Sequence, residues 1–244
     1  MRIGRCSVNS YKVFLCVGIC VGSLVTAALG ASSGLSPLRV GLGSTASAVA
    51  GLIGARIYYI LIYFRMFLKL HSLSGLWDTS KGGVSVLGAL VTFVPASSAA
   101  ATWLDIPVVA LWDHMGLGVL AGGFWIKLGC VFNGCCGGRE TTAQLSVHLR
   151  DTVGVMKRRI PVQFLEMAWS LIGFGAFCLL WRSRFPEGSY ALAVLAGYGI
   201  GRLFLEPLRE RPAVVFGRVY INQIVAALLA IAAGVALIIR NLFA

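Results

Sequence analysis

Long apolar stretches recur along the chain and are separated by short polar breaks. Each stretch has about 20 residues, the length that an α-helix needs to cross roughly 30 Å of hydrocarbon. The breaks are rich in glycine, proline and serine, as turns are. The pattern predicts an all-α, polytopic membrane helix bundle with about seven transmembrane helices, at Val13–Ala31, Gly41–Phe64, Gly82–Ala101, Pro107–Val131, Phe164–Trp181, Ser189–Leu205 and Ile221–Leu242.

The longest polar break, residues 134–161, separates the fourth and fifth predicted spans. We expect it to form a small extramembrane cap on a single integral membrane domain, residues 1–244. Several spans carry small residues at close spacing, such as Gly116, Gly118, Gly122 and Gly123. Small residues let helix backbones approach closely in lipid, so a compact bundle is expected.

Composition supports lipid as the solvent of this chain. Of its 244 residues, 58% are hydrophobic and 12% are charged, and the mean hydropathy is +0.84. The formal charge is +12, but no run of lysine and arginine with interleaved aromatic residues is present, so nucleic acid is not an expected partner. The positive excess is better matched to anionic lipid headgroups.

The most informative positions are the ionisable residues within or at the rim of the spans, namely Arg56, Lys127, Glu166, Arg202, Glu206 and Arg209. A lone charge at the bilayer centre costs several kcal/mol, so each needs a partner or a wet cavity. Glu206 follows Arg202 by four residues and precedes Arg209 by three, so a helix would place the three near one face, with Tyr198 one turn earlier. Pro207 is expected to end or kink this helix.

Two interpretations of this cluster remain open. It could be an internal ion pair that locks the bundle, or an anion pocket for a lipid phosphate. The pocket is favoured because further cations could converge on it, and guanidinium groups match phosphate oxygens bidentately. These further cations are Arg56, Lys127 and Arg139.

A second cluster contains Cys130, Cys135 and Cys136, with Asn133 and several glycines between and after them. Thiols beside Lys127 and Arg139 could ionise and act as nucleophiles or redox groups. A vicinal disulfide, or plain packing of small residues at a helix crossing, would explain the same residues. Their spacing gives little support to zinc, so neither a metal nor another cofactor is expected.

Five segments give more specific information about function: Gly51 to Tyr59, Trp77-Asp78 with Gly82 to Ser85, Lys127 to Arg139, Pro161 to Glu166, and Gly197 to Arg209. Together they resemble motifs of the prolipoprotein diacylglyceryl transferase family, and the last is the closest match. Family members are integral membrane enzymes that move diacylglycerol from phosphatidylglycerol to a lipoprotein cysteine. An acceptor thiol attacks a glycerol carbon, and glycerol phosphate leaves.

The resemblance implies roles for matching residues. Those implied to be catalytic are Tyr198, Arg202, Glu206, Lys127 and Asn133, and those implied to bind phospholipid are Arg56, Lys127, Gly138, Arg139, Arg202 and Arg209. The sequence departs from the family pattern where a histidine, an arginine, an asparagine and a glutamate are expected. Those positions hold Leu87, Lys127, Cys130 and Cys135, as in a divergent branch rich in glycine and cysteine.

The resemblance therefore implies a transferase of the bacterial cytoplasmic (inner) membrane, with phosphatidylglycerol or another anionic phospholipid as donor. Its acceptor would be the thiol of a lipoprotein or of another substrate. A non-catalytic phospholipid-binding protein is one alternative, and a redox or transport protein that uses the three cysteines is another. Orientation stays open, because the positive-inside rule puts the N-terminus in the cytoplasm and the family puts it outside.

Overall fold

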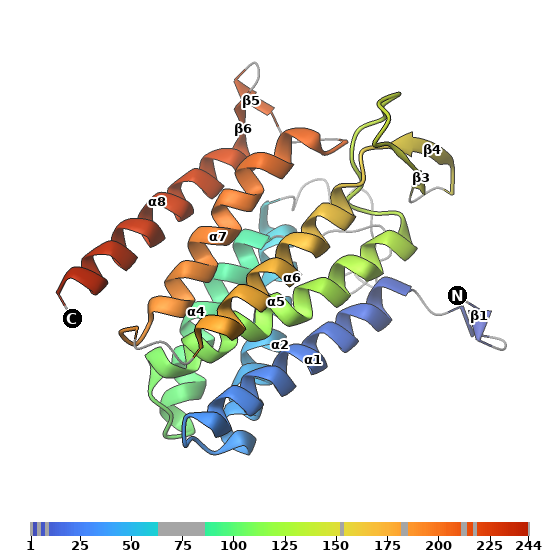
Figure 1. The fold of residues 1–244 in the computed structure, drawn as a ribbon. Coiled ribbons are helices and arrows are strands. Elements are labelled where there is room, and N and C mark those ends of the chain that lie inside the picture. Colours follow the sequence, from blue (N-terminus) through green and yellow to red (C-terminus); the bar gives the residue numbers. More distant parts are fainter. Residues whose placement is uncertain are drawn as a thin grey trace. The chain divides into compact units, whose positions relative to one another are not determined.

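The computed structural model describes residues 2–3, 6–7, 10–62, 86–151, 154–181, 185–210, 214–216 and 219–243. Seven long helices dominate this part of the chain (Figure 1): α1 (Ser10–Ser32), α2 (Pro37–Ile62), α4 (Val86–Trp103), α5 (Val108–Asn133), α6 (Val162–Leu180), α7 (Ser189–Leu205) and α8 (Ile221–Leu242). Within the described ranges, six of them are long and apolar enough to cross a membrane, all but α4. The predicted multi-pass helix bundle is confirmed.

The helices group into two compact units, and the candidate site lies in the first. Unit 1 comprises residues 1–25 and 112–244, and unit 2 comprises residues 26–111. In unit 2, α2 packs closely on α4, where Gly54 faces Thr92 and Gly88 faces Tyr58. A side chain at either glycine would collide with its neighbour, so the small residues set this contact.

Within unit 1, glycines bring α1 and α5 into backbone contact. A Cβ atom at Gly22 would lie 2.8 Å from the carbonyl oxygen of Gly118, and one at Gly18 would lie 2.8 Å from that of Gly122. No larger residue fits at that distance, so the glycine spacing on α5 serves helix packing as expected. This contact fixes α5, which carries Lys127 and Cys130 towards its C-terminal end.

The remaining helices of unit 1 run beside one another (Figure 1). Gly123 of α5 faces Ser170 of α6, and Gly199 of α7 lies against Ala226 and Ala230 of α8. Helix α7 begins where Asp113 of α5 accepts hydrogen bonds from the backbone N–H groups of Gly188 (2.6 Å) and Ala191 (2.8 Å). This carboxylate satisfies donors that the first turn of a helix leaves unpaired.

At its other end, α7 stops at Leu205 and tightens into the 3-10 turn η2 (Glu206–Leu208). Pro207 explains the change, since it has no N–H group to continue the α-helical ladder. The expected end of the helix at this proline is confirmed. The turn redirects the chain so that Arg209 leaves the helix with extended backbone.

Short strands complete the described structure. The segment between α5 and α6 contains the antiparallel hairpin of β3 (Val147–Arg150) and β4 (Met156–Arg159). The other pairs are β1 (Arg2–Ile3) with β2 (Cys6–Ser7), and β5 (Val214–Phe216) with β6 (Val219–Tyr220). The extramembrane placement of residues 134–161 and the single-domain organisation stay predictions. The motif residues Trp77, Asp78 and Gly82 to Ser85 lie outside the described residues.

Candidate functional site: a buried ionic network beside three thiols

The carboxylate of Glu166, on α6, lies among three cations from two other parts of unit 1. Its Oε2 atom is 2.6 Å from Nζ of Lys127 on α5. Its Oε1 atom is 2.6 Å from a terminal nitrogen of Arg209 and 3.3 Å from one of Arg202. Glu166 is buried, and a buried carboxylate needs such partners to offset its lost hydration.

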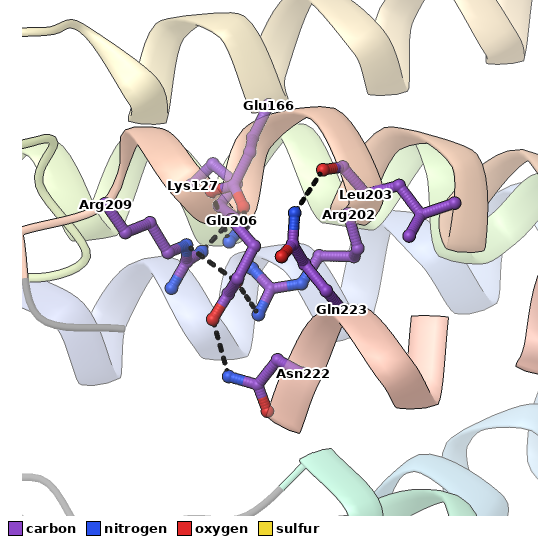
Figure 2. A network of polar contacts seen from close by, with 8 residues as sticks. All are labelled: Lys127, Glu166, Arg202, Leu203, Glu206, Arg209, Asn222 and Gln223. Atoms are coloured by element: carbon purple, nitrogen blue, oxygen red, sulfur yellow. Dashed lines mark hydrogen bonds and ion pairs between the residues drawn. The ribbon is translucent and has the colours of Figure 1, made fainter. Parts of the chain in front are cut away.

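Glu206 forms a second anionic centre next to the first (Figure 2). Its Oε2 atom is 2.7 Å from Arg202 and 3.7 Å from Nε of Arg209, and its side chain is only 1% exposed. Asn222, at the start of α8, donates a hydrogen bond of 2.6 Å to Oε1 of Glu206. The two arginines are thus each shared between two carboxylates.

We call this group the Glu166 network; its members are Lys127, Glu166, Arg202, Glu206 and Arg209. It contains three cations and two carboxylates, so it carries one excess positive charge. Side chains of its cations are between 14% and 26% exposed, whereas its carboxylates are at most 8% exposed. The positive groups therefore face the more open side of the network.

The backbone of the cysteine-rich segment is tied to the network through η2. Gly138 pairs with Arg209 as an isolated antiparallel bridge, and the N–H group of Arg139 donates to the carbonyl of Leu208 at 2.9 Å. A Cβ atom at Gly138 would collide with the carbonyl of Ile160. Glycine is therefore required at position 138, because a side chain would not fit between the two segments. The backbone pairing at Gly138 holds Arg209 in place.

The three cysteines of this segment come together beside the network. The sulfur atoms of Cys130, Cys135 and Cys136 all lie within 4.8 Å of one another, and all three are free thiols. The pKa of Cys136 is lowered because its sulfur accepts hydrogen bonds from Cys130 and Cys135, and the charges of Lys127 and Arg209 act in the same direction. Asn133 is hydrogen-bonded to the Cys135 thiol.

A separate ionic group surrounds Arg159 at the end of β4. We call it the Arg159 network; its members are Glu140, Asp151, Lys157, Arg159 and Glu210. Arg159, whose side chain is 3% exposed, lies 2.8 Å from Glu210, 3.5 Å from Asp151 and 3.8 Å from Glu140. Lys157 adds an exposed pair with Glu140 at 2.5 Å. This group joins the hairpin to the chain after η2.

The structure brings together four of the candidate residues named from the sequence, Lys127, Arg202, Glu206 and Arg209. Tyr198 is 40% exposed and is not a member of the network, and Arg139 is exposed as well. Arg56 is buried in unit 2, so its approach to the cluster stays a prediction. The roles of all these residues stay predictions too.

Three further residues belong to this region and were not singled out as site residues. Glu166 is the hub of the network, Asn222 holds Glu206, and Gln163 donates a hydrogen bond of 3.0 Å to the carbonyl of Cys135. A signal for two of them existed, since Gln163 and Glu166 lie in the segment Pro161 to Glu166 that resembles a family motif. Asn222 stands at the start of an apolar helix and gave no comparable signal.

A multi-pass membrane bundle with a buried, net positive network can hold an anionic headgroup beside a group of thiols. These features define a class of multi-pass membrane protein with a buried, positively charged polar site. The chain matches the family described as prolipoprotein diacylglyceryl transferase over residues 1–240. It therefore belongs to the prolipoprotein diacylglyceryl transferase family, as the motifs indicated.

Individual relatives carry a more specific name. The chain is 26% identical over 241 residues to the phosphatidylglycerol–prolipoprotein diacylglyceryl transferase of Symbiobacterium thermophilum, covering 95% of this chain and 88% of the relative. It is 27% identical over 250 residues to the protein of the same name from Corynebacterium efficiens, covering 95% of this chain and 77% of the relative. The similarity thus extends well beyond the motifs.

Proposed function

We propose that this protein transfers diacylglycerol from phosphatidylglycerol to a thiol, in the cytoplasmic membrane of a bacterium. The main observation in support of this proposal is the Glu166 network, which places one excess positive charge in a buried site of a multi-pass membrane protein. Family membership supports a transferase over the two alternatives, a non-catalytic lipid-binding protein and a thiol redox or transport protein. A lipoprotein cysteine is the proposed acceptor.

Charge supports phosphatidylglycerol as the donor. Its phosphodiester carries one negative charge, which matches the single excess positive charge of the network. Arg202 and Arg209 are held by Glu166 and Glu206, so their guanidinium groups are oriented before lipid arrives. Preorganised donors of this kind lose little conformational entropy on binding.

The same cations would assist departure of the leaving group. When the thiolate attacks the glycerol carbon, the carbon–oxygen bond to phosphate breaks and glycerol phosphate gains a second negative charge. Fixed cations in a site with little water stabilise a charge that develops in the transition state. Lys127 and Arg209 suit this role because both are only partly buried and keep capacity for additional hydrogen bonds.

The test measures transfer of radiolabelled diacylglycerol from phosphatidylglycerol to a cysteine peptide by purified protein. We expect Arg209→Ala to lower the transfer rate about 100-fold or more, since removing one preorganised donor has effects of that size. Arg209→Lys should lose less, because it keeps the charge but not the bidentate fork.

Arg39→Ala is the matched control. Arg39 forms an exposed ion pair with Asp105 in unit 2, at 3.7 Å, and we expect its loss to leave transfer unchanged. A peptide with serine in place of cysteine controls for the acceptor. Equal activity of wild type and Arg209→Ala would refute the proposed role of the network, and absence of transfer by a folded wild type would refute the proposed function.

A further inference from the structure

The cysteine cluster beside the Glu166 network has the geometry of a metal site. A tetrahedral zinc ion with Zn–S bonds of about 2.3 Å holds its sulfur ligands roughly 3.8 Å apart. The sulfur atoms of Cys130, Cys135 and Cys136 already lie within 4.8 Å of one another. The distances therefore differ from the zinc-bound spacing by about 1 Å at most.

The backbone between the cysteines is organised to bring the thiols together. Cys130 lies in the last turn of α5, and the N–H group of Cys135 donates to its carbonyl at 3.1 Å. Gly134 and Cys136 both have left-handed backbone, with φ angles of +72° and +59°. This conformation is uncommon for a residue other than glycine. At Cys136 it turns the chain back towards the other two thiols.

We infer that Cys130, Cys135 and Cys136 bind a zinc ion, and that the fourth position on this ion takes the acceptor thiol as a thiolate. Zinc sites with three protein ligands keep one position for water or substrate. The burial of the cluster fits such an open site, because Cys130 is buried, Cys135 is half-buried and Cys136 is exposed. The exposed side is where an incoming thiol can reach the ion.

This inference rests on the proposed function and adds a way to deprotonate the acceptor thiol. A thiol that coordinates zinc loses its proton, which passes to solvent through the exposed side of the cluster. The zinc-bound sulfur then attacks the glycerol carbon of phosphatidylglycerol, a carbon–sulfur bond forms, and the carbon–oxygen bond to glycerol phosphate breaks. The products are a thioether, glycerol phosphate and the released proton, with no oxidant or reductant.

The first experiment measures metal binding without any reaction. Reduced, chelator-treated protein in detergent is titrated with Co²⁺, which gives thiolate-to-metal charge-transfer absorption, and Zn²⁺ is then used to displace it. We expect one ion per chain, and a loss of affinity of about 100-fold or more in Cys135→Ser, which removes one ligand. Cys178→Ser, which changes an exposed cysteine on α6, should bind as wild type does.

Adding a cysteine peptide to the cobalt protein tests the open position. We expect the charge-transfer band to intensify as a fourth thiolate binds, and a serine peptide to leave it unchanged. Absence of one-to-one metal binding by wild type would overturn the inference. Binding that does not respond to the cysteine peptide would overturn the assignment of the fourth position.

The second experiment separates this inference from the proposed function. Chelator-treated wild type should retain binding to phosphatidylglycerol vesicles, lose transfer about 100-fold or more, and recover with one equivalent of Zn²⁺. Undiminished transfer without metal would overturn the inference and leave the proposed function standing. Failure of transfer in the zinc-loaded protein, with cobalt binding and the peptide response intact, would overturn the proposed function and leave the metal site standing.

Discussion

The two ionic networks of unit 1 differ in the sign of their excess charge and in which member is buried. In the Arg159 network the buried residue is the cation, and its three carboxylate partners are 21% to 51% exposed. In the Glu166 network the carboxylates are buried and the cations face the open side. The first network carries one excess negative charge and the second one excess positive charge.

This difference separates a structural role from a binding role. The cation of the Arg159 network is enclosed by its carboxylate partners and is not open to a ligand, and the group links the β3–β4 hairpin to the chain after η2. The Glu166 network has more positive than negative charge, so a bound anion would neutralise its excess charge. Substitutions in the two networks should therefore change different properties.

The largest effect is expected for Glu166→Ala. It leaves Lys127, Arg202 and Arg209 together with a single carboxylate, and removing one partner of a buried ionic group costs about 3–5 kcal/mol of unfolding free energy. Thermal unfolding in detergent measures the loss. We also expect anionic lipid to restore part of the stability, because its phosphate replaces the missing negative charge.

Glu166→Gln is the matched variant, since it keeps the size of the side chain and one acceptor oxygen but removes the charge. It should be destabilised less than Glu166→Ala and gain similarly from phosphatidylglycerol. If neither variant is stabilised more by phosphatidylglycerol than by a zwitterionic lipid, the excess positive charge does not serve anion binding.

A smaller effect is expected for Arg159→Met, which keeps much of the apolar stem of the buried side chain. The carboxylates that it leaves are partly exposed and can be hydrated, so we expect a loss of about 2 kcal/mol, within the range of ordinary single substitutions. Hydrogen exchange of the β3–β4 hairpin should rise. Transfer from phosphatidylglycerol should fall much less than in Arg209→Ala, and an equal fall would remove the distinction between the networks.

Sequence patterns predicted the parts of the fold and site that depend on local spacing. Apolar runs indicated the helices, Pro207 indicated the end of α7, and the spacing of Arg202, Glu206 and Arg209 placed these three together. The hub was harder to recognise, because Glu166 meets Arg202 across 36 residues of sequence. Only tertiary packing of α6 on α7 decides that contact.

Two other site features could not follow from spacing. Tyr198 lies one helical turn before Arg202, yet the direction of a side chain within a bundle depends on its neighbours, and this tyrosine is 40% exposed. The separation of Cys130 from Cys135 and Cys136 is unlike that of common zinc motifs. The left-handed backbone at Gly134 and Cys136, which brings these thiols together, has no signature that distinguishes it in the sequence.

The smallest effect is expected for Lys157→Ala. Its ion pair with Glu140 is short, at 2.5 Å, but the two side chains are 45% and 51% exposed. Water and salt screen such a pair, which is typically worth about 0–1 kcal/mol. Unfolding of the variant should therefore differ little from wild type at low salt and not at all at high salt. A larger, salt-independent loss would mean that Lys157 supports the buried Arg159, and that the whole Arg159 network acts as one unit.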